Sequence, residues 1–206
     1  MSATLAAFRD RLSYQGISLG VVALLASSAL VVGNQLTHEA IVRAEARDLA
    51  VSLAQVLPEG SADNDLLKDI VKVGAGETAV TVHRARKGGV ATAAVFRMAE
   101  RGYAGDIVVL MGVAADGRLL GVRIIKHAET PGLGDKIEIA KAQWILAFNG
   151  KSLGNPPAEK WAVKKDGGVF DQFAGATITP RAVVKAVKRG LEFFTAHRDE
   201  IFREAS

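Results

Sequence analysis

The pattern of apolar and polar positions divides the chain into one long uncharged stretch and a remainder with shorter periodic segments. Ser13 to Thr37 form 25 consecutive residues without a charge. At about 1.5 Å per residue, a helix over residues 13–37 spans roughly 37 Å and can cross a hydrocarbon core of about 30 Å. Buried helices of soluble proteins rarely contain more than about 14 successive apolar residues. The stretch therefore predicts a single-pass transmembrane helix.

A cleaved signal peptide is the main alternative, because small residues stand near the end of this stretch at Ser27, Ser28 and Ala29. The apolar run continues for three residues beyond them, which suits a membrane span better than the short apolar core of a signal peptide. Two arginines lie in residues 1–12, whereas acidic residues outnumber arginines in residues 38–48. The positive-inside rule therefore predicts a cytoplasmic N-terminus at residues 1–12 and a main domain on the outer, periplasmic face.

Helical periodicity continues after the span. The apolar residues that recur at helical spacing are Val42, Leu49, Leu53 and Val56. Pro58-Glu59-Gly60 interrupts this pattern, and a second, short helix is expected around Asp65–Val73. Residues 38–74 are therefore predicted to form a helical connector.

Strand-like patterns dominate the next part of the chain. Four segments with the apolar content of strands are Ala79–Ala85, Val90–Met98, Gly105–Ala114 and Leu119–Lys126. Asp116-Gly117 separates the last two of these segments, and this dipeptide between apolar runs is a strong signal for a hairpin turn. The strands are therefore expected to form a largely antiparallel sheet.

Two further segments have the periodicity of helices. The first has an apolar face made by Ile137, Ala140, Trp144, Ile145 and Phe148. The second, at the end of the chain, has Val183, Val184, Val187, Leu191, Phe194 and Ile201 at helical spacing. Sheet and helices together predict the α+β class, with one domain over residues 75–206 and no linker within it.

Composition narrows the possible chemistry. The chain of 206 residues is 49% hydrophobic and 23% charged, and it contains no cysteine. Disulfides, thiolate-bound zinc, cysteine-ligated iron–sulfur clusters and a cysteine nucleophile are therefore excluded. Much of the hydrophobic content is concentrated in the uncharged stretch, so the remainder has the composition of an ordinary domain.

Charge and motifs exclude further classes. The net charge of +4 reflects a modest excess of basic residues, which suits a solvated helix face or contact with an acidic partner better than nucleic-acid binding. The four histidines are scattered without the spacing of metal ligands, so no metal site is predicted. The nucleophile-elbow, Walker A and dinucleotide-binding motifs do not occur, and no catalytic residue in the acid–base sense is identified.

One candidate site lies directly before the last predicted helix, in Asp171–Pro180. Thr179 is placed as the N-cap of that helix and Pro180 as its first residue. Thr177 would then stand just ahead of the helix N-terminus, where unpaired backbone N–H groups favour a phosphate. Gly175 would allow a bulky phosphate-bearing group to approach the backbone. A plain helix cap with a small-residue turn explains the same pattern.

A second candidate is the loop His127–Gly134, which follows a predicted strand and is rich in glycine and proline. Its glycines would let the backbone approach a flat ligand, while Glu129 and Thr130 supply polar contacts. Loops of this composition also serve simply to turn the chain.

The order and spacing of three motifs resemble a known family. These are Glu129-Thr-Pro-Gly-Leu-Gly134, Trp161-Ala-Val-Lys-Lys-Asp-Gly-Gly168 and Asp171…Gly175-Ala-Thr177-Ile-Thr179. Together they resemble the FMN-binding domain of the G subunit of the Rnf (Rsx) ion-translocating electron-transport complex. The likeness covers roughly residues 75–200, and an N-terminal span followed by an outer domain matches the layout of that family.

The resemblance implies a covalent cofactor. In that family the last threonine of the Gly-Ala-Thr motif is esterified to the phosphate of FMN by a dedicated flavin transferase, and the matching residue here is Thr177. The other residues that the resemblance places at the cofactor are Glu129, Thr130, Leu133, Gly134, Lys164, Gly175, Ala176 and Thr179. Asp171, Gly175 and Ala176 match the pattern that the transferase recognises. Ala174 departs from it, since the family often has Ser or Thr at that position.

The resemblance also implies a function. The chain would be a redox subunit of a translocase in the bacterial inner membrane, not a stand-alone catalyst. Its FMN would carry electrons between neighbouring membrane and redox subunits during ferredoxin/NAD electron transfer coupled to ion translocation. Two alternatives are kept open: the C subunit of the sodium-pumping NADH:quinone reductase, which shares the domain, and a cofactor-free scaffold on the outer face.

Overall fold

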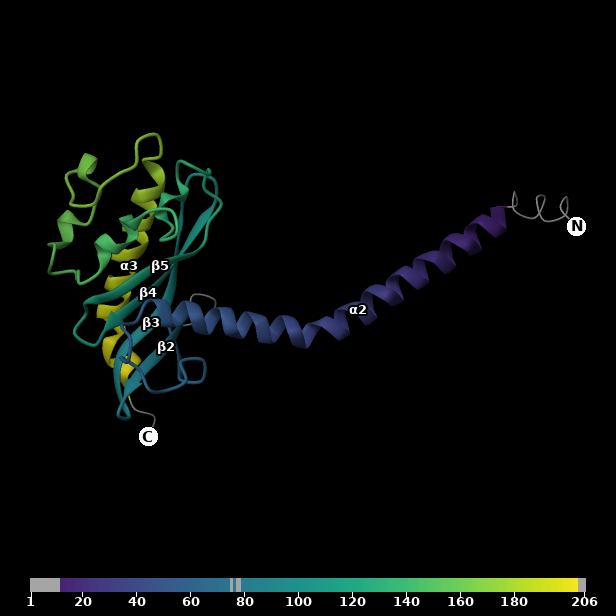
Figure 1. The fold of residues 1–206 in the computed structure, drawn as a ribbon, viewed down its shortest axis with the longest axis horizontal. Helices are drawn as coiled ribbons and strands as arrows, with labels where there is room; N and C mark the ends of the chain where they lie inside the picture. Colours follow the sequence, from purple (N-terminus) through teal and green to yellow (C-terminus); the bar gives the residue numbers. More distant parts are fainter. Residues whose placement is uncertain (1–11, 75, 77–78, 204–206) are drawn as a thin grey trace, which may run out of the picture. The chain divides into compact units, whose positions relative to one another are not determined.

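The fold is described from a computed structural model that covers residues 12–74, 76 and 79–203 (Figure 1). The arginines on which the predicted membrane orientation rests lie in residues 1–11, outside the described residues. The chain divides into two compact units, Met1–Arg47 and Asp48–Ser206.

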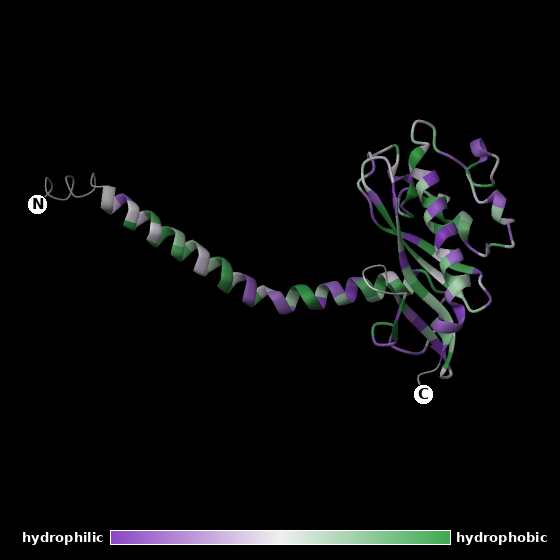
Figure 2. Ribbon diagram, turned by 180° about the vertical axis from the view of Figure 1, so that it is seen from behind, coloured by the Kyte–Doolittle hydropathy of each residue, from purple (hydrophilic) through white to green (hydrophobic). Residues whose placement is uncertain are grey.

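The described part of the first unit belongs to helix α2, which runs from Leu12 to Gln55. Figure 2 shows hydrophobic residues along the first half of this helix and a hydrophilic segment after it. Leu19 and Leu30 are 72% and 75% exposed, and none of the most apolar window, whose mean hydropathy is 2.1, is buried by the described residues. A helix with exposed apolar side chains over this length is suited to a lipid environment. The predicted long apolar helix is confirmed.

The second unit is built on a five-stranded antiparallel sheet with the order β1-β2-β3-β4-β5. The strands are β1 (Ile70–Val73), β2 (Val80–Lys87), β3 (Val90–Arg101), β4 (Asp106–Ala114) and β5 (Leu119–Lys126). Val113 pairs with Leu119 at the β4–β5 hairpin, and Gly117 takes a φ of 87° in the turn between them. A positive φ suits glycine, so the Asp-Gly signal identifies this hairpin correctly. The predicted α+β class and antiparallel sheet are confirmed.

Strand β1 corrects the prediction of a second helix around Asp65–Val73. Ile70 pairs with His83 of β2 and Val73 pairs with Val80, so the segment forms an edge strand. Leu66, Leu67, Ile70 and Val71 are also compatible with helical spacing, which explains the wrong assignment. Pairing with β2 and complete burial of Val73 outweigh that local pattern.

Helix α3 (Ile178–Phe202) covers one face of the sheet, mainly against β3 and β4. The predicted apolar face is confirmed, because its members are buried against the sheet: Val183, Val184, Val187, Leu191, Phe194 and Ile201. A Cβ at Gly190 would lie 2.2 Å from Met111 Sδ, so a larger residue there would require the buried Met111 side chain to move.

The end of α2 covers the other face of the same sheet, within the second unit. Leu53 and Val56 are 0% and 1% exposed and form a small second core with Val95 and Leu110. The backbone of Val56 comes close to a pair of glycines that face each other across β4 and β5, Gly112 and Gly121. The last turns of the helix are therefore part of the domain core.

An irregular segment connects β5 to α3, and it corrects the prediction of one helix over residues 137–148. The segment contains four short 3₁₀ turns, of which the first two stand in place of that helix: η2 (Asp135–Ile137), η3 (Gln143–Phe148), η4 (Ala158–Lys160) and η5 (Lys164–Asp166). Ala142 has extended backbone angles, φ −157° and ψ 155°, which break any continuous helix between η2 and η3.

Aromatic packing stabilises this segment in place of regular structure. Phe148 stacks on Phe170 with ring centroids 4.5 Å apart, and Trp144 contacts Phe148 and Phe173 edge-on at 5.4 and 5.1 Å. Such pairs add to the free energy of burial. The apolar residues of the predicted helix thus enter the core through a local aromatic cluster, with the exception of Ala140, which is exposed.

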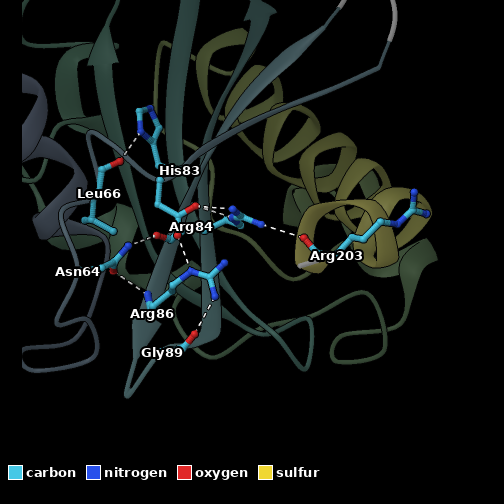
Figure 3. Close-up of polar contacts among 8 residues, drawn as sticks. Asn64, Leu66, His83, Arg84, Arg86, Gly89 and Arg203 are labelled. Atoms are coloured by element: carbon cyan, nitrogen blue, oxygen red, sulfur yellow. Dashed lines mark hydrogen bonds and ion pairs between the residues drawn. The ribbon is translucent and has the colours of Figure 1, made fainter. Parts of the chain in front are cut away.

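A polar cluster holds the loop between α2 and β1 against the outer part of the sheet (Figure 3). The Asp69 carboxylate lies 2.6 Å from Arg84 Nη2 and 2.5 Å from Arg86 Nε. The Asn64 amide donates to the Arg84 carbonyl and accepts from the Arg86 backbone N–H at 2.9 and 2.7 Å. His83 Nδ1 lies 2.8 Å from the Leu66 carbonyl oxygen. These contacts hold the loop before β1 in the part of the chain where the sequence predicted a short helix.

Candidate functional site

A pocket with a volume of about 250 Å³ lies at the N-terminus of α3. Three segments form it: the turn after β3, the loop after β5, and the turn that leads into α3. The residues that line it are Tyr103, Glu129, Thr130, Leu133, Gly134, Gly175, Ala176, Thr177, Ile178 and Thr179. The two candidate segments identified in the sequence therefore meet in space, 41 residues apart from Gly134 to Gly175.

Eight of the nine residues assigned to the cofactor on resemblance line this pocket, and Lys164 does not. Lys164 Nζ instead forms an ion pair with Asp171 Oδ1 at 2.6 Å, with both side chains largely exposed. The pair joins η5 to the segment that precedes the pocket. Lys164 therefore supports the loop from outside the pocket.

Two residues that line the pocket, Tyr103 and Ile178, were not predicted from the sequence. Ile178 directly follows Thr177, so its position beside the site follows from the chain itself. Tyr103 lies 26 residues before Glu129 and reaches the site only because β3, β4 and β5 fold back on one another. No local motif marks Tyr103.

Helix α3 begins at Ile178 with Thr177 as its N-cap, which corrects the prediction that Thr179 caps the helix and Pro180 begins it. Thr177 has helical angles, φ −76° and ψ −27°, and its side chain makes no capping bond. Thr179 lies within the first turn of α3, and its hydroxyl donates to Glu129 Oε2. Pro180 falls in the first turn, where its missing N–H has no helical acceptor to lose.

The start of α3 presents free backbone donors to the pocket. In the described part of the chain, no acceptor bonds the backbone N–H of Ile178 or Thr179. Unpaired N–H groups and the positive end of the helix dipole together favour an anion at this position. Thr177 places a hydroxyl beside the same groups.

A tight turn brings Thr177 to the pocket. The backbone N–H of Ala176 donates to the Phe173 carbonyl at 3.3 Å, and Gly175 has a φ of 82° within this turn. That angle is strained for any residue with a Cβ, so glycine is required here for conformational reasons. A Cβ at Gly175 would also touch Leu133 Cδ2 at 3.5 Å.

Apolar side chains form the outer walls of the pocket. Leu133 and Ile178 are 44% and 48% exposed, and Tyr103 is 68% exposed. Three large, exposed, partly apolar side chains around one opening provide a surface that a flat aromatic ligand can cover.

Glu129 forms the polar floor of the pocket and is only 5% exposed. Its Oε1 accepts hydrogen bonds from the backbone N–H groups of Tyr103 and Ala104 at 2.9 and 3.1 Å. Its Oε2 accepts a hydrogen bond from the Thr179 hydroxyl. Both oxygens of the buried carboxylate therefore accept hydrogen bonds from the protein itself.

His127 fixes the loop that carries Glu129. The backbone N–H of Glu129 donates to His127 Nδ1 at 3.1 Å, so the ring proton lies on Nε2 and is donated to Glu138 Oε1 at 2.6 Å. The loop is therefore held by side-chain contacts on both sides of the histidine ring.

An exposed ion pair connects α3 to η5 near the site. Arg181 donates to both carboxylate oxygens of Asp166 at 2.5 and 2.6 Å. The hydrogen bond from Arg181 lowers the pKa of Asp166, and the same bond raises the pKa of the Arg181 guanidinium.

The described residues contain no group of three or more histidine, aspartate or glutamate side chains arranged to hold a metal ion.

The residues that line the pocket lie within a part of the chain that matches a known domain family. Residues 102–192 match the family described as FMN-binding domain. The chain is 53% identical over 187 residues to the G subunit of the ion-translocating oxidoreductase complex of Stutzerimonas stutzeri, covering 90% of this chain and 82% of that protein. It is 45% identical over 202 residues to the corresponding G subunit of Pseudomonas aeruginosa, covering 95% and 94% of the two chains. The crystal structure of Shewanella oneidensis NqrC matches 72% of each chain with 25% identity and a TM-score of 0.49.

Proposed function

The chain belongs to the family of G subunits of ion-translocating oxidoreductase complexes, whose FMN-binding domain it carries, and from this we propose that it transfers electrons through FMN bound covalently to Thr177. Membership in this family makes it a component of a multisubunit oxidoreductase. The high identity to the G subunits also favours this assignment over the C subunit of the sodium-pumping NADH:quinone reductase.

The pocket fits the two chemical parts of FMN. The free backbone N–H groups of Ile178 and Thr179 and the hydroxyl of Thr177 suit the phosphate. The exposed side chains of Leu133, Ile178 and Tyr103 suit the flat ring. Bound FMN supplies reversible electron transfer, while the protein orients the ring and sets its surroundings.

The attachment site is assigned to Thr177 because the hydroxyl groups of Thr177 and Thr179 differ in exposure and in hydrogen bonding. Thr179 is 1% exposed, and its hydroxyl donates to Glu129. Thr177 is partly exposed, lines the pocket, and its hydroxyl makes no hydrogen bond to another described residue. Of these two threonines, only Thr177 has a hydroxyl that is free to react.

Esterification at Thr177 requires an activated flavin phosphate, because ester formation from a free phosphate in water is unfavourable. We assign the donor to the class of flavin dinucleotides, whose phosphoanhydride bond breaks as the bond from Thr177 Oγ to phosphorus forms. A nucleoside monophosphate leaves, and the hydroxyl proton passes to the flavin transferase. No electron is transferred in this step.

The proposed topology follows from the apolar part of α2. Residues 13–37 would cross the inner membrane, residues 1–12 would be cytoplasmic, and the flavin domain within residues 75–206 would be periplasmic. The other membrane and redox subunits of the complex would then exchange electrons with the flavin on that side, coupled to ion translocation. Covalent attachment would keep the cofactor where no cytoplasmic pool of FMN can replace it.

Thr177→Val tests the attachment site. The full chain is expressed in its membrane with a flavin transferase, denatured, and examined for in-gel flavin fluorescence and for the intact mass. Fluorescence and added mass are expected for the wild type and should be absent in Thr177→Val, because the substitution removes only the oxygen that forms the ester. Thr195→Val is the matched control, since the Thr195 hydroxyl bonds the Leu191 carbonyl within α3, outside the pocket.

Two results would contradict the proposal. A wild-type band of unmodified mass would exclude a covalent flavin and would favour a cofactor-free scaffold. Persistent fluorescence in Thr177→Val would move the attachment to another residue.

A further inference from the structure

The buried carboxylate of Glu129 connects the three segments that form the pocket. We propose that Glu129 and Thr179 are positioning residues for flavin attachment: their hydrogen bond holds the first turn of α3 so that the Thr177 hydroxyl faces the transferase. This inference rests on the proposed attachment at Thr177. It assigns to both residues a role through Thr177 in place of direct contact with the flavin.

The contacts of Glu129 support a structural connection between segments. It lies on the loop after β5, its Oε1 binds the turn after β3 through two backbone N–H groups, and its Oε2 binds α3 through Thr179. Hydrogen bonds to a charged acceptor are stronger than those between neutral groups, and burial shields them from water. One side chain therefore determines how the three walls of the pocket meet.

Two glycines make room for this arrangement. A Cβ at Gly102 would lie 2.5 Å from Glu129 Oε1, and a Cβ at Gly134 would lie 2.9 Å from Glu129 Cβ and 3.0 Å from Thr179 Oγ1. Neither glycine has a positive φ, so the reason for glycine at both positions is space and not backbone conformation. The chain is thus packed closely around the Glu129–Thr179 contact from two sides.

The contact determines where the reactive hydroxyl stands. Thr177 is the N-cap and Thr179 the second residue of α3, so holding Thr179 against Glu129 restrains the first turn directly beside Thr177. The side chain of Thr177 makes no capping bond that could restrain it independently. A displacement of about 1 Å between reacting groups can reduce a rate by about 10²-fold.

The main test compares variants of Thr179 in the rate of flavin attachment. Purified full-length protein in detergent is mixed with flavin transferase and flavin dinucleotide, and covalent flavin is followed by in-gel fluorescence and intact mass. Thr179→Val removes the hydroxyl at nearly constant shape and should lower the initial rate about 10²-fold. Thr179→Ser retains a hydroxyl and should restore most of that rate. Thr195→Val, on the same helix, should react like the wild type.

A second measurement uses the flavin-free protein, so it does not depend on the attachment reaction. Glu129→Ala should accelerate hydrogen exchange at the backbone amides of Tyr103 and Ala104, which lose their acceptor. Thr179→Val should leave these two amides protected, because Oε1 still binds them. It should accelerate exchange only at the first amides of α3 that donate within the helix, which follow Pro180. This difference separates loss of the Glu129–Thr179 bond from general unfolding.

The outcomes distinguish this inference from the proposed function. A wild-type protein that accepts no flavin would overturn attachment at Thr177 and the positioning role with it. Wild-type labelling together with an unchanged rate in Thr179→Val would overturn the positioning role alone. A slow Thr179→Val variant that Thr179→Ser does not rescue would also overturn it, because the shared hydroxyl would then be irrelevant.

Discussion

Asp69 shows how a single carboxylate can organise a loop at the edge of the sheet. Its side chain is 17% exposed and binds the guanidinium groups of Arg84 and Arg86. Burial by itself would raise the pKa of Asp69, but the hydrogen bonds from Arg86 and Arg84 outweigh that effect and hold the pKa below its usual value of 3.8. Folding therefore favours the charged form of this residue.

Asp69→Asn is expected to lower the free energy of unfolding at pH 7 by about 2 kcal/mol, since hydrogen bonds to a charged group are lost. A depressed folded-state pKa contributes stability above the unfolded-state pKa of 3.8, and this contribution is lost as the pH falls through the lower folded value. Urea unfolding between pH 7 and pH 2 should show that the gap between wild type and variant closes only below about pH 4.

Asp116→Asn is the matched control for this measurement. The hydrogen bond from Arg118 also lowers the pKa of Asp116, but its side chain is 53% exposed and its partner 59%. Exposed ion pairs contribute little to stability, so the control should unfold almost like the wild type. If the difference in free energy of unfolding between wild type and Asp69→Asn did not change with pH, the lowered pKa of Asp69 would not contribute to stability.

The candidate site could be predicted from sequence as far as local motifs extend. The Gly-Ala-Thr and Glu-Thr-Pro-Gly motifs lead directly to the pocket, because each is a short segment whose residues stay together in space. Tyr103 could not be found, because only strand pairing brings it there. The N-cap of α3 was predicted at Thr179 but is Thr177, two residues earlier, because sequence patterns do not fix the exact residue at which a helix begins.

At the scale of elements, the long strands were predictable, and short or irregular elements were not. β3 and β4 begin and end within a few residues of the predicted strands, because their apolar content persists over many positions. β1 has four residues and depends on its pairing with β2. The segment over residues 137–148 has the apolar spacing of a helix, yet its residues pack better around aromatic side chains supplied from residues 161–173.

The contact between α2 and the sheet depends on a pair of glycines. Gly112 and Gly121 face each other across β4 and β5. A Cβ at Gly112 would lie 2.4 Å from the Val56 carbonyl oxygen, and a Cβ at Gly121 would lie 2.8 Å from Val56 Cα. These distances are to backbone atoms, which cannot rotate away, so a methyl group must displace Val56, the residue that directly follows α2.

Gly112→Ala and Gly121→Ala are each expected to lower the free energy of unfolding by about 1–3 kcal/mol, the usual cost of overpacking a core. Urea unfolding of the full chain in detergent, followed by tryptophan fluorescence, measures this effect because both tryptophans lie in the second unit. Gly154→Ala is the control, since the nearest atom to its added Cβ would be Ser152 Oγ at 4.0 Å. Wild-type stability of both core variants would show that α2 does not pack on this face.

At the scale of the whole molecule, α2 has residues in both units, and the two sets of residues differ in exposure. The long uncharged stretch of α2 lies in the first unit, where residues 14–37 are exposed, whereas Leu53 and Val56 lie in the second unit and are buried against the sheet. The change occurs across residues 38–48, where charged residues gather. The residues of α2 therefore belong to both units: a segment suited to lipid in the first, and core residues of a folded domain in the second.

The proposed orientation of this helix can be tested directly because the natural sequence contains no cysteine. Two variants, Ser2→Cys and Glu159→Cys, each introduce a single thiol, the first near the N-terminus and the second at an exposed position of η4. If residues 13–37 span the inner membrane with the positive flank inside, a membrane-impermeant maleimide should label Glu159→Cys in intact spheroplasts. Ser2→Cys should react only after the membrane is permeabilised. The opposite labelling pattern would invert the topology and place the pocket, with Thr177, on the cytoplasmic side.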